Sequence, residues 1–339
     1  MRTVFLTALA TSLAVPPFLL GQTPDDSEWN HFSTEARLSF NIRARFQNVG
    51  GVGSVPPPAP SSGGAADRTY GDGFVKVDSS GNQGGLTWNW GYKNNSQVPG
   101  NDTVQFHTSS LTGVTTSRRD DPSLGFELGY VRDFGHERWG NWGLKTAFAY
   151  NTIRLEDRQG YSVDVSQVTD SYPLNGLLAP LAPYNGAFQG PGIAIGSTPT
   201  RSSQTTPRGA QISGSRSVDA DLYQLHLGPD AKYWISDRLS LEVSAGLALG
   251  IIDSTLSYSE SIATSDSTRS ISGGHQGTGI LPGVYVEAEL NYRFWRSASV
   301  FGGVGFEYLG TFNQSAGPRS VQLDLSETVI GLAGLRWSF

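Results

Sequence analysis

The chain of 339 residues contains no cysteine, which excludes disulfides and cysteine-ligated metal sites. Charged residues are also scarce, at 16%, against about 25% in an ordinary soluble domain. The formal net charge is −6 and no cluster of Lys and Arg opposes it, which argues against a nucleic-acid partner. Beyond the N-terminal segment no run of about 18 apolar residues occurs, so the rest of the chain has no candidate transmembrane helix.

Glycine and aromatic residues are abundant instead, with 42 glycines and 11% aromatics. Together with the low charge and the absence of long apolar runs, this composition is typical of a large β protein. Residues 1–22 hold a basic Arg2 followed by an apolar run that two prolines interrupt. We interpret this segment as a cleaved secretory signal rather than a membrane anchor, and expect a single domain over residues 23–339.

Period-2 alternation is the dominant pattern of the remaining sequence. In residues 33–47 apolar side chains occupy the even positions, and charged or polar side chains occupy the odd positions. That period is typical of a β-strand with one apolar and one polar face. The same alternation recurs in seven further stretches, at 123–134, 141–155, 219–235, 238–259, 279–295, 298–309 and 327–339.

The connections between these stretches alternate in length. Short ones at 135–141, 236–237 and 296–297 separate long ones at 48–121, 156–217, 258–277 and 311–320. This asymmetry indicates an antiparallel, up-and-down transmembrane β-barrel with long external loops. We expect eight strands, or 10–12 if residues 85–92 and 102–109 enter the wall. Aromatic residues gather near the short turns, where an apolar band would meet lipid headgroups: Phe134, Trp139, Trp142, Trp234, Trp295, Trp337 and Phe339.

A sheet in lipid must close so that its backbone groups are paired, with the apolar face outward and the charged face inward. The inward face then collects eight acids and seven bases, including Glu35, Asp133, Asp230 and Lys232. Because a narrow barrel is filled by its side chains, this balance predicts a charge-paired plug rather than a pore with one sign in excess. The predicted lumen network comprises Arg37, Arg43, Arg45, Glu127, Lys145, Glu242, Glu287, Glu289, Arg293, Glu307 and Arg336.

The signal segment, the alternating strands, the loop asymmetry and the terminal "LRWSF" together resemble bacterial outer-membrane β-barrels. They are most similar to the small outer-membrane-protein-A and opacity-type surface antigens. The resemblance implies a location in the cell outer membrane and contact with its lipid and lipopolysaccharide. It also implies recognition of the last strand by the outer-membrane insertion machinery, with Leu335, Trp337 and Phe339 as the assembly signal.

The leading functional hypothesis is a non-enzymatic barrel with a structural or surface-interaction role, without a catalytic site, metal or cofactor. A porin or a transporter of small solutes or hydrophobic ligands is the alternative if the barrel is wider. A lipid-modifying enzyme is a third, because His226 lies near Ser240, Ser244 and Glu242 in the sequence. The hairpin turn pairs His226 with a position near Leu247, so a plain lumen histidine is favoured. The ligand and the oligomeric state stay open.

Overall fold

The computed structural model describes residues 29–54, 57–60, 65–120, 122–137, 140–265 and 267–339. The predicted signal at 1–22 and the side chain of Trp139 lie outside these residues. The described chain is nearly all β-strand, with three short 3-10 helices at Gln83–Gly85, Asn95–Gln97 and Pro99–Asn101. Within the described ranges we find no helix that is both long and apolar enough to cross a membrane.

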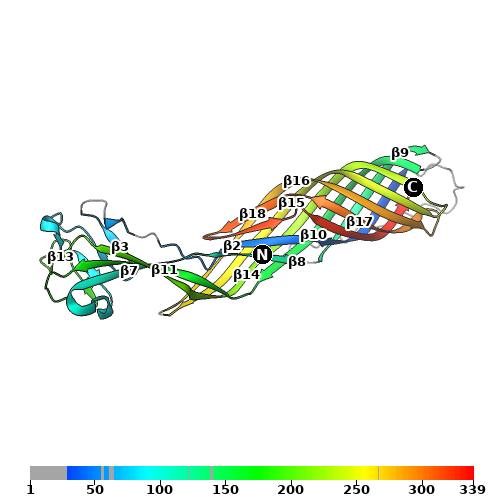
Figure 1. Ribbon diagram of the computed structural model, residues 1–339. Helices are drawn as coiled ribbons and strands as arrows, with labels where there is room; N and C mark the ends of the chain where they lie inside the picture. The colour runs from blue at the N-terminus through cyan, green and yellow to red at the C-terminus, as the bar shows by residue number, and fades with distance from the viewer. Residues whose placement is uncertain (1–28, 55–56, 61–64, 121, 138–139, 266) are drawn as a thin grey trace, which may run out of the picture.

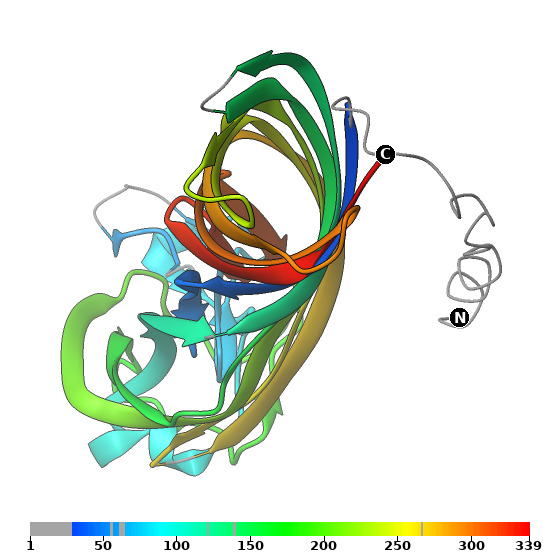
Figure 2. The ribbon, with the colours of Figure 1, turned by 90° about the vertical axis from the view of Figure 1, so that its right-hand side faces the viewer.

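A closed ring of antiparallel strands forms one end of the molecule (Figure 2). The ring closes because β10 pairs with both β9 and β14, and because the first strand pairs with the last from His31↔Ser338 to Phe40↔Val329. The predicted all-β antiparallel barrel is therefore confirmed. In the described residues eight strands make the ring, in the order β1 (Asn30–Phe40), β9 (Ser123–Glu137), β10 (Gly140–Asp157), β14 (Thr200–Trp234), β15 (Leu239–Thr264), β16 (Thr268–Arg293), β17 (Ala298–Tyr308) and β20 (Thr328–Ser338).

An apolar band covers the outside of this ring. Large apolar side chains are exposed on every one of its strands, for example Phe32, Leu124, Phe148, Leu225, Leu247, Val284, Val304 and Leu335. At the short-turn end the band finishes in exposed aromatic side chains, including Trp142, Trp295, Trp337 and Phe339. An exterior of this kind is stable in lipid and not in water.

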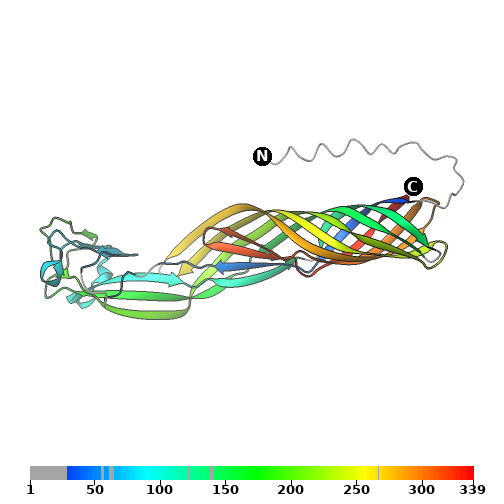
Figure 3. The ribbon, with the colours of Figure 1, turned by 90° about the horizontal axis from the view of Figure 1, so that it is seen from above.

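The strands of the ring continue into a long extension of the wall (Figures 1 and 3). Strand β14 has 35 residues and β15 has 26, whereas about 9–11 residues suffice to cross a bilayer. Four further strands complete the wall there, in the order β18 (Thr311–Ala316), β19 (Arg319–Asp324), β2 (Ile42–Val49) and β8 (Val114–Asp120). Strand β18 lies against β16, and β8 lies against β10. The long external loops predicted at 156–217 and 258–277 are thus mostly regular sheet, which we call the stalk.

The stalk exists because its strands carry an apolar inner face. Along β15 the even-numbered side chains point inward throughout, from Ser240 to Ile262. They are polar within the apolar band, as at Glu242, and mostly apolar above it, as at Ile252 and Leu256. The odd-numbered outer residues change in the opposite sense, from Ile251 to exposed Asp253. This reversal within the stretch 238–259 marks the passage from lipid to water.

Strands β1 and β2 make the same transition by a break in the backbone. Asn41 between them has a φ of 69°, a left-handed conformation that Asn adopts more readily than most residues. The break turns the inner face from odd positions, such as Arg37, to even ones, such as Ala44 and Phe46. Gly310, with a φ of 74°, separates β17 from β18 in the same way.

A neck and a head extend from the stalk at the far end from the ring (Figure 1). In the neck, β11 (Tyr161–Pro173) pairs with β14 on one side and with β7 (Thr103–Leu111) on the other. The head has its own core, in which Tyr70, Trp90, Phe106 and Tyr172 are buried. Its strands are β3 (Arg68–Tyr70), β4 (Gly73–Val75), β5 (Leu86–Thr87), β6 (Trp90–Tyr92), β12 (Tyr184–Asn185) and β13 (Ile195–Gly196). Residues 85–92 and 102–109 therefore belong to the head and neck and do not widen the ring.

Candidate functional site: two buried charge networks in one tube

A network of buried charges, here called the lower network, fills the ring inside the apolar band. Each of the eight strands contributes a side chain to it, because period-2 alternation points every second residue inward. The contributors are Arg37, Glu127, Lys145, His226, Glu242, Glu287, Glu289, Glu307 and Arg336, and all of them are buried.

Arg37 holds one half of the lower network together. Its Nη1 lies 2.5 Å from Glu127 Oε2, and its Nη2 lies 2.6 Å from Glu307 Oε2. Glu307 also accepts hydrogen bonds from Gln224 Nε2 at 2.7 Å and contacts His226 Nε2 at 3.2 Å. Arg37 on β1 thereby connects β9 with β17, and Glu307 on β17 in turn contacts Gln224 and His226 of β14 across the ring.

Lys145 and Arg336 hold the other half. Lys145 Nζ lies 2.6 Å from Glu287 Oε2, 3.3 Å from Glu289 Oε1 and 3.4 Å from Glu127 Oε1. Arg336 Nη2 lies 2.7 Å from Glu289 Oε2, and its Nη1 donates to Glu242. Lys145 on β10 and its partners on β16 lie on strands separated by β14 and β15, so these bonds cross the lumen. Side chains bonded across the lumen obstruct it.

Three of the bases predicted for the lumen lie elsewhere. Arg43 and Arg45 follow the break at Asn41, so they face outward on β2 instead of inward. Arg293 is exposed at the short-turn end, where its Nη2 donates to the carbonyl of Asp237. The prediction for Arg43 and Arg45 assumed that the alternation continues without a break through Asn41. The left-handed conformation of Asn41 instead turns these two residues of β2 outward.

The lower network consequently has more acids than bases. The eight predicted acids all lie buried in the ring, and of the seven predicted bases Arg37, Lys145, Lys232 and Arg336 remain with them. Among the described residues, neither carboxylate oxygen of buried Glu35 has a hydrogen-bond partner, and Asp230 has one unpartnered oxygen. The near-neutral balance inferred from the sequence is therefore replaced by an excess of carboxyl groups.

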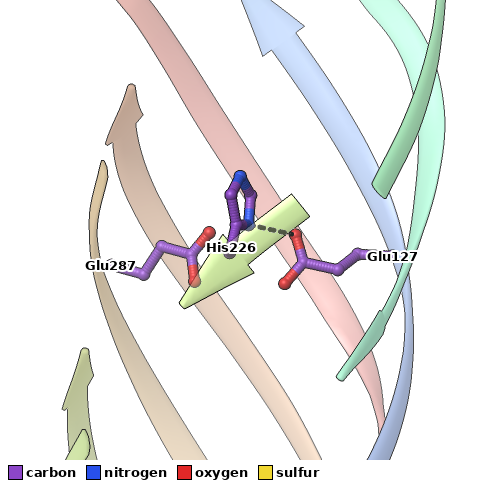
Figure 4. A group of neighbouring side chains, drawn as sticks. All are labelled: Glu127, His226 and Glu287. Atoms are coloured by element: carbon purple, nitrogen blue, oxygen red, sulfur yellow. Dashed lines mark ion pairs between the residues drawn. The ribbon is translucent and has the colours of Figure 1, made fainter. Parts of the chain in front are cut away.

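Glu127, His226 and Glu287 bring three potential metal-ligand atoms within 4.8 Å of one another (Figure 4). The two carboxylates come from opposite sides of the ring and His226 lies between them, with its Nδ1 3.6 Å from Glu127 Oε2. Both carboxylates already bind cations, since Arg37 contacts Glu127 and Lys145 contacts Glu287. A divalent ion at this position would stand beside two fixed positive charges, so the donor set suits the ion pairs better than a metal.

His226 does not form a nucleophilic site with serine. Its Nε2 faces Glu307 and its Nδ1 faces Glu127, and in the described residues neither nitrogen hydrogen-bonds to a serine. The register pairs His226 with Ala248 on β15, whereas Ser240 pairs with Trp234 and Ser244 with Asp230. The geometry favours the interpretation of His226 as a lumen histidine.

A second network, the upper network, lies in the stalk and was missed in the sequence. Asp157 Oδ1 lies 2.7 Å from Arg118 Nη2, and Asp157 Oδ2 lies 3.2 Å from Arg216 Nη1. Arg216 Nε lies 3.0 Å from Glu260 Oε1, and Arg319 Nη2 lies 2.7 Å from Glu260 Oε2. The sequence did contain a sign of this network. Arg216 and Glu260 occupy inward positions of their strands, next to apolar inward residues such as Val218 and Ile262.

Hydrogen bonds hold Asp157 in its charged form. Burial raises the pKa of this carboxyl, but donation from the Gln159 N–H, Arg118, Tyr161 and Thr116 outweighs burial and brings the pKa to about 2. Between the two networks the interior is apolar, with Ile153, Leu222, Ile252 and Leu309 buried there. The tube is thus filled at three successive levels.

The head carries an exposed apolar segment. Residues 171–200 contain no Asp, Glu, Lys, Arg or His. Leu177, Leu178, Leu181 and Phe188 are 44%, 75%, 83% and 52% exposed. The segment is nevertheless held to the head, because the Tyr92 hydroxyl donates to the Pro180 carbonyl and the Ala182 N–H donates to Asn95 Oδ1 at 2.8 Å.

A closed antiparallel sheet with an apolar exterior and a filled, charged interior defines an outer-membrane β-barrel. Accordingly, we place the chain in a bacterial outer membrane, as the sequence predicted.

The chain is similar to several solved structures at low sequence identity. Ail, the attachment invasion locus protein of Yersinia pestis solved with the heparin analogue sucrose octasulfate, is 11% identical over 91% of this chain and 99% of its own, with a TM-score of 0.28. The outer-membrane protease OmpT of Escherichia coli is 10% identical over 95% and 99%, with a TM-score of 0.34. A Pseudomonas aeruginosa FadL homologue is 8% identical over 92% and 90%, with a TM-score of 0.19. These likenesses concern the barrel architecture alone.

No protein-family model matches the sequence, and no curated protein matches it either.

Proposed function

We propose that this protein is a non-enzymatic outer-membrane barrel that displays its head for contact with other surfaces. The observation that carries the proposal is the continuation of the wall strands into a stalk that bears a separately cored head. The part of β14 above the apolar band, residues 200–221, measures about 70 Å along the strand at 3.3 Å per residue. A protein whose task lay within the membrane would have no use for so long an extension.

The obstructed lumen supports the same proposal over a porin or a transporter. Arg37 and Lys145 bind carboxylates across the ring, and an apolar section and the upper network lie above them. In planar bilayers we expect no ion-conducting events of nanosiemens size, and in liposomes no swelling with sugars. Regular conductance or sugar uptake would favour the porin and contradict this part of the proposal.

The exposed apolar segment of the head is the contact surface that we propose. Large apolar side chains rarely stand so far out of a water-soluble surface without a partner. Its lack of charge suits an apolar or zwitterionic partner surface better than a strongly charged one. Contact with lipopolysaccharide and recognition of Leu335, Trp337 and Phe339 by the insertion machinery belong to the same proposal, supported by the outward exposure of these three side chains.

Attachment of cells that display the protein tests the role of the head. We expect such cells to bind epithelial monolayers or immobilised neutral phospholipid vesicles several-fold better than cells without it. The double variant Leu178→Asp/Leu181→Asp should lose this gain, since a charge on each side chain opposes apolar contact. The control Ser203→Asp/Thr205→Asp adds the same charge to exposed positions of the neck and should keep it. Equal attachment by both variants would contradict the proposed contact surface.

The non-enzymatic part has a separate test. Purified His226→Ala protein and the unchanged protein should be equally inactive toward phospholipid substrates. A lipase activity that disappears in the variant would favour the enzyme alternative.

A further inference from the structure

Four arginines line a cavity on the outer surface of the stalk. Arg43 and Arg45 come from β2 and Arg118 and Arg119 from β8, and the cavity they border has a volume of about 340 Å³. The register places Arg43 directly opposite Arg119. Like charges directly opposite on neighbouring strands repel each other, so this arrangement is unfavourable without an anion between them.

In the part of the chain that the structure describes, the acids near this cavity pair with Arg118 and Arg43 and leave Arg45 and Arg119 without an ion-pair partner. Asp157 binds Arg118 from inside the stalk. Asp324 also lines the cavity and lies opposite Arg43 in the register. Its Oδ1 accepts hydrogen bonds from the N–H and hydroxyl of Ser326, at 3.1 and 2.6 Å, and its negative charge offsets part of that of Arg43.

Arg43 has two partners on its own side of the wall. Its Nη2 donates to Asn41 Oδ1 at 2.9 Å and also faces Glu327. Glu327 Oε2 lies 3.6 Å from Arg43 Nη2, and these two side chains are 64% and 43% exposed, so the pair contributes little. Among the described residues, Arg45 and Arg119 form no ion pair, and the buried Nε of Arg43 has no hydrogen-bond partner. Arg45 and Arg119 are thus available to bind an external anion, with the partly satisfied Arg43 beside them.

The height of the cavity indicates which anion it meets. Phe40, the last residue of β1, pairs with lipid-facing Val329 at the upper edge of the apolar band. Arg43 follows three residues later, which is about 10 Å further along the strand. The headgroups of the outer leaflet lie at that distance above the hydrocarbon core.

We propose that Arg43, Arg45 and Arg119 form a binding site for the phosphate group of an outer-leaflet lipid. Planar guanidinium groups bind phosphate oxygens with paired hydrogen bonds, and three of them around one cavity match a doubly charged phosphomonoester. The site clamps the barrel to its surrounding leaflet at the base of the stalk. The site rests on the contact with outer-leaflet lipid proposed above and is independent of the role proposed for the head.

Lipid binding by the full chain in nanodiscs tests the proposal. The nanodiscs contain neutral phosphatidylcholine with or without a minor fraction of phosphatidic acid, whose headgroup is a phosphomonoester, and bound lipid is counted by native mass spectrometry. We expect the unchanged protein to retain phosphatidic acid, and Arg45→Gln/Arg119→Gln to bind it about tenfold more weakly. High salt should weaken retention by the unchanged protein, because exposed charges are screened.

A matched control removes the same charge on a neighbouring strand. Arg154→Gln/Arg158→Gln takes one exposed arginine from β10 and one from the residue that follows it. Arg154 lies opposite Asp219 in the register, and Arg158 Nε lies 2.6 Å from Glu156 Oε1. This control should retain phosphatidic acid like the unchanged protein. Equal losses in both double variants, or no loss in either, would overturn the site.

A soluble phosphate arm distinguishes the lipid from a free ion. Inorganic phosphate, titrated into the protein in a neutral detergent, should bind far more weakly than phosphatidic acid in the nanodisc. Equal affinity for inorganic phosphate would contradict the proposal that the bound phosphate group belongs to a membrane lipid. Heat-modifiable migration of all variants on a gel should stay unchanged, because the substituted side chains lie on the outside of the wall.

Discussion

The part of the tube inside the membrane and the part above it use the same strands with opposite faces. Along β15 the inner side chains change from Ser240 and Glu242 to Ile252 and Leu256 without a change of parity. Between β1 and β2 the sequence parity continues, and a left-handed Asn41 turns the backbone over. Each strand that leaves the lipid must move its apolar residues from the outer face to the inner face. This happens either by a change in the sequence pattern or by a turn of the backbone.

The two charge networks differ in their balance of acids and bases. The lower network has an excess of carboxyl groups and spans the ring from wall to wall. The upper network sets three arginines against Asp157 and Glu260, whose oxygens are all bonded. The interior of the ring is therefore held by polar bonds, whereas the stalk has an apolar core that contains a few charges whose carboxylate oxygens are all bonded.

Removal of Arg37 should have the largest effect. In Arg37→Ala, Glu127 and Glu307 lose their nearest cation in a buried site, so we expect the free energy of unfolding to fall by about 3–5 kcal/mol. Urea titration followed by heat-modifiable gel migration measures it. Arg158→Ala, which removes an exposed arginine, should change it by less than about 0.5 kcal/mol. Similar losses in both variants would contradict the central role of Arg37.

Asp157→Asn should weaken the stalk and flatten its pH dependence. The folded-state pKa of about 2 lies below the ordinary 3.8, so the stability from Asp157 is present above pH 3.8 and is lost as the pH falls toward 2. We expect a neutral-pH loss of about 3 kcal/mol, because Arg118 and Arg216 lose a bonded partner. Pepsin cleavage at pH 2, 3 and 4 should accelerate steeply only in the unchanged protein. The exposed Asp219→Asn is the control, and an equally steep profile in Asp157→Asn would count against the assignment.

Ile251 and Ile252 offer a direct comparison of the two faces at the border. Ile252 is fully buried in the apolar section, so Ile252→Ala should leave a cavity and cost about 2.5 kcal/mol. Ile251 faces outward, and Ile251→Ala should cost less than about 1 kcal/mol. Urea titration of both variants measures the difference. A larger loss of stability for Ile251→Ala would mean that the odd-numbered residues of β15, and not the even-numbered ones, face the interior.

Asn41 tests the exchange of faces by the backbone. Asn41→Gly should preserve the left-handed conformation at little cost. Asn41→Val should lose about 1–2 kcal/mol, since a β-branched side chain disfavours a φ of 69°. The same urea titration compares them, and equal stability of the two variants would remove the reason given for the break.

The smallest effect on stability is expected for deletion of Phe339. Its N–H and carbonyl pair with Asn30, so the folded barrel would lose two peripheral hydrogen bonds. The larger consequence should be fewer inserted barrels with secretion unchanged, measured as outer-membrane and periplasmic fractions. Ser338→Ala is the control, and normal insertion without Phe339 would contradict its role as an assembly signal.

Much of the barrel followed from local patterns. Eight alternating stretches, separated by turns of unequal length, indicated an antiparallel barrel, and the apolar face of each stretch marked its lipid side. Both signals reside in neighbouring residues, because the period of a strand is two and lipid contact demands apolar side chains. The inward positions of Arg37, Lys145 and Glu287 could be assigned on this basis alone.

The sequence by itself determined which residues alternate, but only the tertiary structure decided which way they face above the membrane. The fate of Arg43 and Arg45 depended on one left-handed residue, and the upper network joined strands that lie far apart in the sequence. Bond partners across a ring depend on register and strand order, which alternation does not encode. The head likewise required contacts between segments around residues 70, 90, 106 and 172, because its core is assembled from short strands that have no pattern of their own.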